Sequence, residues 1–168
     1  MAIITRETNH SLKSLTAEGS LLELLFWIRA SEKNSSLNPN GINNIIWNIS
    51  DSSDIITGTF NLPIQTELQP TGGTLYRAVE SLSGFSFIGN SPSGTGTFKA
   101  QTPNALLMEI ADYLQNLESI PAKNPQEKNN LTATIDRDKG VYSGSFTLPF
   151  LLATIGSGTS LVAVEYLL

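Results

Sequence analysis

Apolar residues recur at helical spacing in two separate stretches of the chain. In residues 102–118 the apolar residues form a stripe along one side of a helix. They are Leu107, Ile110, Ala111, Leu114 and Leu117. Residues 16–33 carry an equivalent stripe at Leu21, Leu24, Leu25 and Ile28. Both stretches start at a threonine, which is favoured at helix starts, and both run into a loop with an Asn-Pro pair. We therefore predict one amphipathic helix in each half of the chain.

Apolar and polar residues alternate after each predicted helix. In the second half, alternation over residues 131–135 is followed by DRDKG, a tight-reversal sequence, and by a strand that starts at Val141. The first half has DSSD at the corresponding point. After Pro63 or Pro149 the chain stays extended, turns at glycines and returns as a third strand, so each proline should mark a bulge or an edge in a long bent strand. We also expect a strand before each helix, at 9–15 and at 94–100.

One six-residue phrase occurs twice in nearly the same spelling, GTFNLP at 58–63 and GSFTLP at 144–149. The same offset of 86 residues aligns further pairs without a gap, among them Glu23 with Glu109, Glu32 with Glu118, Asn38 with Asn124, Gly72 with Gly158, Leu75 with Leu161 and Leu82 with Leu168. We interpret the phrase as structural, with Phe60 and Phe146 pointing into the core and the glycine admitting a close neighbour. The pattern predicts an internal duplication.

The predicted fold class is therefore α+β, with two tandem β-α-β-β-β repeats related by a pseudo-two-fold and one helix per repeat on antiparallel sheet. A chain of 168 residues is long enough for one well-buried core, whereas each half is too small to bury its own apolar face. We expect residues 1–168 to form a single compact domain made of two internal repeats, 1–86 and 87–168.

This order of elements, doubled in one chain, resembles the repeat of the ring-shaped DNA sliding clamps at the level of topology. The resemblance implies a trimeric ring of six units with helices lining the hole. Such a lining needs Lys and Arg to face phosphate, yet the helix at 102–118 contains neither and carries Glu109, Asp112 and Glu118. The clamp-like ring is therefore the least favoured of the alternatives.

Composition narrows the classes of partner. The net charge of −5 disfavours binding to nucleic acid or to an anionic membrane, which needs clustered Lys and Arg. The chain has no cysteine, so disulfides, thiolate catalysis and cysteine-ligated metal are excluded. The N-terminus lacks the apolar core of a secretory signal, and the longest apolar run, at 21–28, is too short to span a bilayer. We expect a cytoplasmic protein with no membrane segment, no cofactor and no metal.

Few residues suggest chemistry. Glu23 and Glu109 sit on the two predicted helices in apolar surroundings, and a pseudo-two-fold could bring the carboxylates together beside Trp27 and Tyr113 as a ligand-binding or acid/base pocket. The simpler interpretation places both glutamates on the solvent-exposed face of their helices. His10 is the single histidine and has no partner pattern for a metal or triad site. The acidic turns lack the EF-hand pattern, and the glycine-rich segment 91–98 matches no phosphate-binding loop.

Surplus apolar residues suggest an interface. Phe26 and Trp27 stand where the second copy has Asp112 and Tyr113, so the first helix is apolar nearly all round and must be covered on two sides. Either the other repeat or another subunit could provide this cover. The last strand, at 160–168, is apolar on both faces. As an uncovered edge strand it would be prone to pair with another chain. The predicted interface residues are Leu22, Phe26, Trp27, Val164, Tyr166 and Leu168.

Two functions from different classes remain open. The leading hypothesis is a non-catalytic interaction or assembly protein that acts through homo-oligomer or partner-binding surfaces, with no catalytic residue assigned. The alternative is an enzyme or small-ligand-binding protein with a carboxylate pocket on the pseudo-two-fold.

Overall fold

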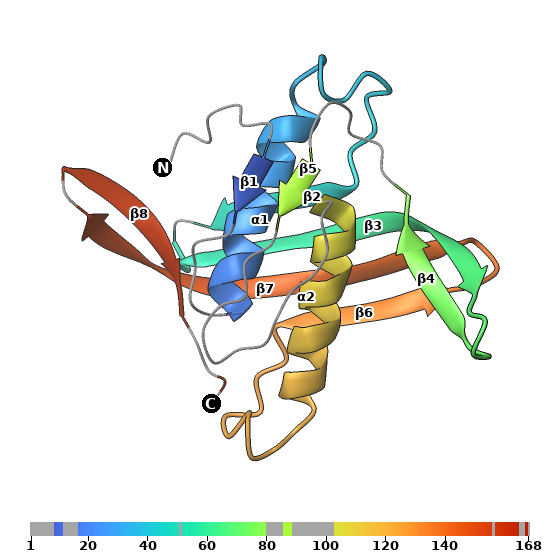
Figure 1. The fold of residues 1–168 in the computed structure, drawn as a ribbon. Coiled ribbons are helices and arrows are strands. Elements are labelled where there is room, and N and C mark those ends of the chain that lie inside the picture. Colours follow the sequence, from blue (N-terminus) through green and yellow to red (C-terminus); the bar gives the residue numbers. More distant parts are fainter. Residues whose placement is uncertain are drawn as a thin grey trace.

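A computed structural model describes residues 9–11, 17–50, 52–79, 86–88, 103–155, 157–164 and 167. Two helices and a six-stranded antiparallel sheet within these residues make an α+β fold, as predicted (Figure 1). The strand expected at 94–100 and the glycine-rich segment 91–98 lie outside the described residues, as do both predicted helix-capping threonines.

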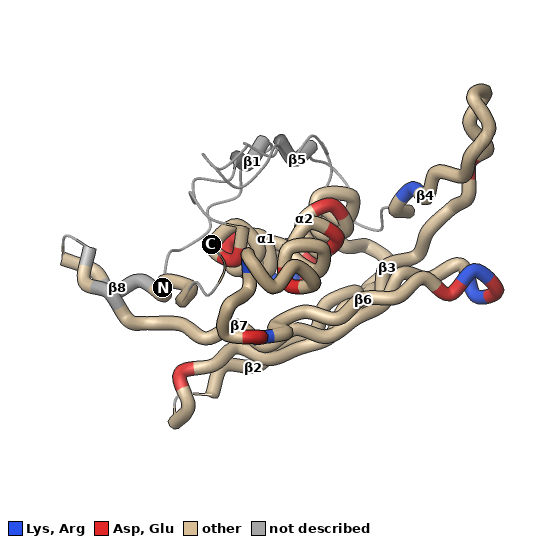
Figure 2. Tube along the Cα trace, turned by 90° about the horizontal axis from the view of Figure 1, so that it is seen from below, with Lys and Arg blue, Asp and Glu red and all other residues tan. Residues whose placement is uncertain are grey.

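The two helices match the ranges that hydrophobic periodicity predicted. Helix α1 spans Ala17–Glu32 and helix α2 spans Pro103–Glu118, so the offset is 86 residues at both ends. Proline is favoured at the first helical position because its missing N–H has no partner there in any case. The helices lie side by side on one face of the sheet, and the core fills the space between the two layers (Figures 1 and 2). The stripe residues Leu21, Leu25, Ile28, Leu107, Ile110 and Leu114 are all buried.

The centre of the sheet has the strand order β2-β3-β7-β6, and every neighbouring pair is antiparallel. These strands are β2 (Ile45–Ser50), β3 (Ile55–Leu68), β7 (Val141–Ile155) and β6 (Leu131–Asp136). The reversal between β6 and β7 is the predicted turn: Asp136 Oδ1 accepts the N–H groups of Asp138 and Lys139, each at 3.1 Å. A single continuous sheet therefore joins strands from both halves of the chain.

The repeated phrase lies where the two halves meet. Across the β3–β7 ladder, Thr59 pairs with Ser145, Gly58 pairs with Phe146 and Phe60 pairs with Gly144. A Cβ atom built on Gly58 would lie 2.6 Å from Phe146 Cζ, and one built on Gly144 would lie 2.6 Å from Phe60 Cζ. Each glycine therefore makes room for the phenylalanine of the opposite strand, and both rings are buried.

Two hairpin arms extend from opposite ends of the central sheet (Figure 1). In the β3–β4 arm, residues 64–68 of β3 pair with β4 (Thr74–Ala78), and in the β7–β8 arm, residues 150–155 of β7 pair with β8 (Gly158–Ala163). Pro63 and Pro149 each occupy the last position of the β3–β7 ladder, just before the arm begins. Each proline therefore marks the point where its strand exchanges one partner for another.

The constant offset predicted for the last strand is wrong by one residue. Ile64 pairs with Ala78, whereas Phe150, 86 positions after Ile64, pairs with Ala163, only 85 positions after Ala78. The loops differ in length, since the strands of the β3–β4 arm are joined by residues 69–73 and those of the β7–β8 arm by residues 156–157. By position in the hairpin, Leu161 therefore corresponds to Tyr76 and not to Leu75.

The strands that precede the helices do not join the antiparallel sheet. β1 (Asn9–Ser11) and β5 (Ser86–Ile88) pair with each other in parallel as a separate two-stranded sheet. The expectation that all strands belong to antiparallel sheet is wrong here. A parallel pair is possible because α1 and the β2–β4 meander lie between β1 and β5 in the sequence and supply the long crossover that parallel strands require.

Candidate functional site

The four predicted ligand-binding residues lie on the helices. Glu23 and Glu109 are half-buried at corresponding positions of α1 and α2, Tyr113 packs half-buried against the core, and Trp27 is 2% exposed. A hollow of about 440 Å³ is lined by other residues, from β3, β6 and β7. Among the described residues, no group of three or more His, Asp or Glu side chains could hold a metal ion. His10 lies in β1, where its backbone pairs with Phe87. The carboxylate pocket remains a prediction.

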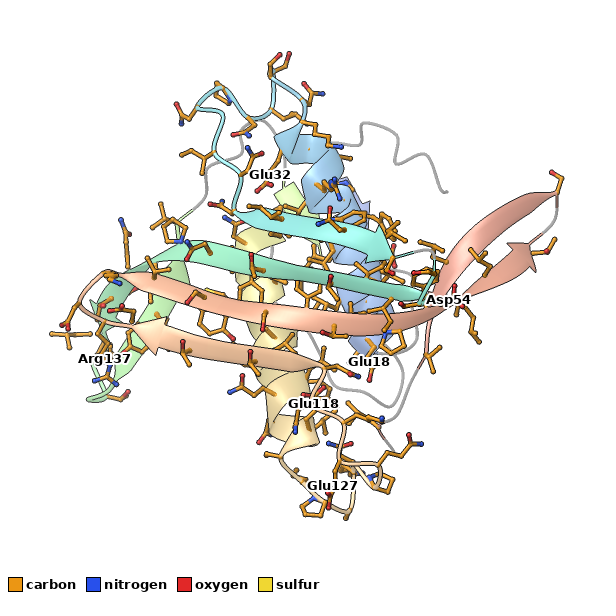
Figure 3. All side chains as sticks on the ribbon, turned by 180° about the vertical axis from the view of Figure 1, so that it is seen from behind. Glu18, Glu32, Asp54, Glu118, Glu127 and Arg137 are labelled. Atoms are coloured by element: carbon orange, nitrogen blue, oxygen red, sulfur yellow. The ribbon has the colours of Figure 1, made fainter. Side chains whose placement is uncertain are left out.

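A second pair of glutamates, one on each helix, has a clear structural role. Glu32 Oε1 accepts the backbone N–H of Asn44, and Glu118 Oε1 accepts that of Asn130, both at 2.9 Å. Burial raises the pKa of each carboxyl above its ordinary value of 4.5, and the N–H donors lower it only in part. These carboxylates tie the last turn of each helix to the start of the next strand, at opposite ends of the helix layer (Figure 3).

The loops that follow the helices are held by matched asparagines. Asn38 Nδ2 donates to the carbonyls of Glu32 and Ile42, and Asn124 Nδ2 donates to those of Glu118 and Lys128, at 2.8 to 2.9 Å. Sequence matching paired these glutamates and asparagines but gave them no role. Their partners are 4 to 12 residues away along the chain, so the signal that could have found them is the spacing of Glu and Asn that repeats in the two halves.

The two helices differ where they contact the sheet. On α1, the Phe26 ring packs edge to face against Trp47 of β2, with 4.8 Å between the ring centres. The Arg29 guanidinium lies 4.2 Å from the centre of the same indole ring. At the position on α2 that matches Phe26, Asp112 Oδ1 accepts the hydroxyl of Tyr142 at 2.7 Å. Burial first, and then this hydrogen bond, raise the pKa of the Tyr142 hydroxyl. Both contacts join helix to sheet, one by aromatic packing and one by a partly buried hydrogen bond.

The predicted interface residues separate into three groups. Leu22 and Trp27 are 4% and 2% exposed, so their side chains are covered within the chain and the prediction that they face a partner is corrected. Phe26 and Val164 are half-buried, and Phe26 is covered in part by Trp47. Tyr166 and Leu168 lie outside the described residues.

The two arms have the same pairing but different surface chemistry. At the second pair of residues of the β3–β4 arm, Gln65 lies opposite Arg77, and Arg77 Nε forms an ion pair with Glu67. The corresponding pair of the β7–β8 arm is Leu151 opposite Val162, and these side chains are 61% and 43% exposed. The neighbouring Leu152, whose side chain points to the other side of the strand, is 66% exposed. The β7–β8 arm therefore carries bare apolar groups on both sides and no charge, whereas the β3–β4 arm combines its exposed Leu68 and Leu75 with an ion pair.

Among the described residues, the central part of the sheet face opposite the helices carries no charged side chain. Within the part of the chain that the structure describes, no element lies on this open face, and the charged residues gather on the helices and turns (Figures 2 and 3). Apart from Ile46, which is 63% exposed, the side chains at the centre of this face are small and polar. The open face consists of Ile46, Asn48, Thr57, Thr59, Asn61, Thr132, Thr134, Ser143, Ser145 and Thr147. The hollow described above opens on it.

Comparisons with protein-family models, with curated proteins and with solved structures find no match. Neither α1 nor α2, the helices of the described residues, has the length and apolar character needed to cross a membrane.

Proposed function

We propose that the chain is a tandem duplication in which residues 1–86 and 87–168 are two copies of one module. The offset of 86 residues between the helices, and between the strands β2 and β6, supports this proposal. So do the matched hydrogen bonds of Glu32 and Glu118. The symmetric β3–β7 pairing, centred on Thr59 and Ser145, supports a pseudo-two-fold between the copies.

On this scaffold, the function that we propose is assembly. The chain forms a homo-oligomer through exposed surfaces of its own fold and catalyses no reaction. The observation that carries the proposal is the β7–β8 arm, with Leu151, Leu152 and Val162 exposed on its two sides. A two-stranded hairpin is marginally stable alone in water, and a bare apolar strand edge invites association. The sequence from 141 to 164 contains no charged residue that would prevent such pairing. The arm therefore has the composition of a contact surface.

The β3–β4 arm supplies the matched substitution that tests this function. The double variant Leu151→Gln, Val162→Arg copies the residues at the corresponding positions of that arm, which the same chain folds into the same kind of hairpin. We expect the wild-type chain to form an oligomer at micromolar concentration and the double variant to have a lower mass by light scattering, with an unchanged circular dichroism spectrum. A monomeric wild-type chain, or a variant of undiminished mass, would contradict the proposed function.

A further inference from the structure

We propose that the open face of the sheet is a two-fold interface, covered by the same face of a second copy of the chain. The inference rests on the homo-oligomer proposed above and names the surface that forms it. The arm residues Leu151 and Val162 belong to this surface, because side chains two positions apart along β7 share a face of the sheet and Leu151 continues the row of Ser145 and Thr147.

The chemistry of the open face suits a copy of itself. A two-fold interface places the same patch on both partners, so the patch must be complementary to itself. Hydroxyl groups both donate and accept hydrogen bonds, and amide groups carry both functions. The hydrogen bond between Thr132 Oγ1 and Ser145 Oγ, at 2.9 Å, shows this pairing within one sheet. A face of threonine, serine and asparagine can therefore pair with its own copy, whereas a face of one charge sign would repel it.

Charge also favours this face over the other surfaces. The chain carries a net charge of −5, so two copies repel each other over most approaches. The strands β2 and β7 contain no charged residue, β3 contains none before Glu67, and β6 contains none before Asp136 at its end. Two copies that meet through the open face thus bring no like charges together at its centre.

The size of the surface suits a weak dimer. Four strands about 4.8 Å apart, each about six residues long at ~3.3 Å per residue, give a flat area of roughly 400 Å². The β7–β8 arm turns out of the plane of these strands toward the helix layer and adds no flat area (Figure 2). The four strands of two copies together then bury about 800 Å² before the relief of the side chains is counted, which is the size of a weak, transient interface. Overlap is greatest when the two-fold axis passes near the centre of the face, beside Thr59 and Ser145.

Lysine substitutions at the centre of the face test the inference. Thr59→Lys and Ser145→Lys each place two like charges close together across the proposed axis, so we expect the mass by light scattering to fall two-fold, from dimer to monomer. Thr71→Lys, at an exposed threonine in the loop of the β3–β4 arm, is the matched control and should leave the mass unchanged. A dimer that survives both central substitutions overturns this inference. If Leu151→Gln, Val162→Arg still dissociates that dimer, the proposed function stands and the interface lies elsewhere on the arm.

A crosslink gives a second readout that does not depend on dissociation. The chain has no cysteine, so Ser145→Cys introduces a single thiol at the centre of the face. Under mild oxidation we expect a disulfide-linked dimer on a non-reducing gel, whereas Lys139→Cys, in the exposed β6–β7 turn, should stay monomeric. Equal crosslinking of the two variants overturns the inference. A wild-type chain that is monomeric by light scattering overturns both proposals and leaves the open face to a ligand or to a different protein.

Discussion

The glycines of the repeated phrase should be among the least replaceable residues of the sheet. In Gly58→Ala the new Cβ would collide with the Ile46 carbonyl oxygen, with Phe146 Cζ at 2.6 Å and with Trp47 Cβ at 2.7 Å. In Gly144→Ala it would collide with the Thr132 carbonyl oxygen and with Phe60 Cζ at 2.6 Å. Since both phenylalanines are buried and the oxygens belong to neighbouring strands, neither obstacle can move alone.

The cost follows from this crowding. Overpacking a well-filled core by one methyl group costs about 1 to 3 kcal/mol. The reduced entropy of the unfolded chain returns about 0.4 to 1 kcal/mol of it in a Gly→Ala change. Because each new methyl meets both a backbone oxygen and a buried ring, we expect a net loss of about 2 kcal/mol for each variant. With a urea slope of about 2 kcal/mol per molar, the unfolding midpoint should fall by about 1 M.

Urea unfolding followed by circular dichroism measures both variants, and a double-mutant cycle shows which contact causes the loss. Phe146→Leu shortens the ring that faces Gly58, so Gly58→Ala should cost less in the Phe146→Leu background than in the wild type. Losses below about 0.5 kcal/mol for the single variants, the usual range for surface changes, would refute the close-approach reasoning. Strongly unequal losses for Gly58→Ala and Gly144→Ala would argue against equivalent halves.

Two further predictions concern the ends of the helices. The raised pKa of Glu32 and Glu118 means that the folded chain keeps these protons at a higher pH than the unfolded chain, so the free energy of unfolding should fall as the pH rises from 4.5 through the raised values. The double variant Glu32→Gln, Glu118→Gln should lose part of this fall in urea titrations at pH 4 to 7, and an unchanged fall would contradict the assignment. Glu127 has a φ of 52°, where Gly41 stands in the first half with a φ of 62°. Glu127→Gly should therefore raise the free energy of unfolding by about 1 kcal/mol, whereas an unchanged or lower urea midpoint would count against strain at this residue.

The local parts of the fold were predictable from the sequence because their causes are local. Helix ranges follow from the spacing of apolar residues within one element, and the β6–β7 turn follows from the side chain of Asp136. The register of the last strand was not predictable by alignment, since the loops of the two arms differ in length. The parallel pairing of β1 with β5 joins residues separated by most of one half of the chain, and no local pattern specifies it.

The candidate surfaces were harder to predict because exposure is a property of the whole fold. The sequence left open whether the other repeat or a partner chain covers Phe26, and Trp47 from β2 covers part of its ring. The sequence predicted an extended strand after Pro149 but not its exposure, and β7 extends past the helix layer and leaves Leu151 and Leu152 bare (Figure 1). Sequence can show that a segment is apolar, whereas only the arrangement of elements shows whether anything covers it.

A comparison of the two arms separates what the hairpin requires from what it does not. Both arms have a proline just before them and the same antiparallel pairing, so these features meet the needs of the fold. Gln65 and Arg77 occupy the second pair of positions in one arm, and Leu151 and Val162 occupy it in the other. Folding of the hairpin therefore does not require apolar residues at this pair. Exposed leucine and valine gain nothing in water that glutamine and arginine would not supply at lower risk of aggregation. The apolar pair at these positions therefore supports the contact between copies that is proposed above.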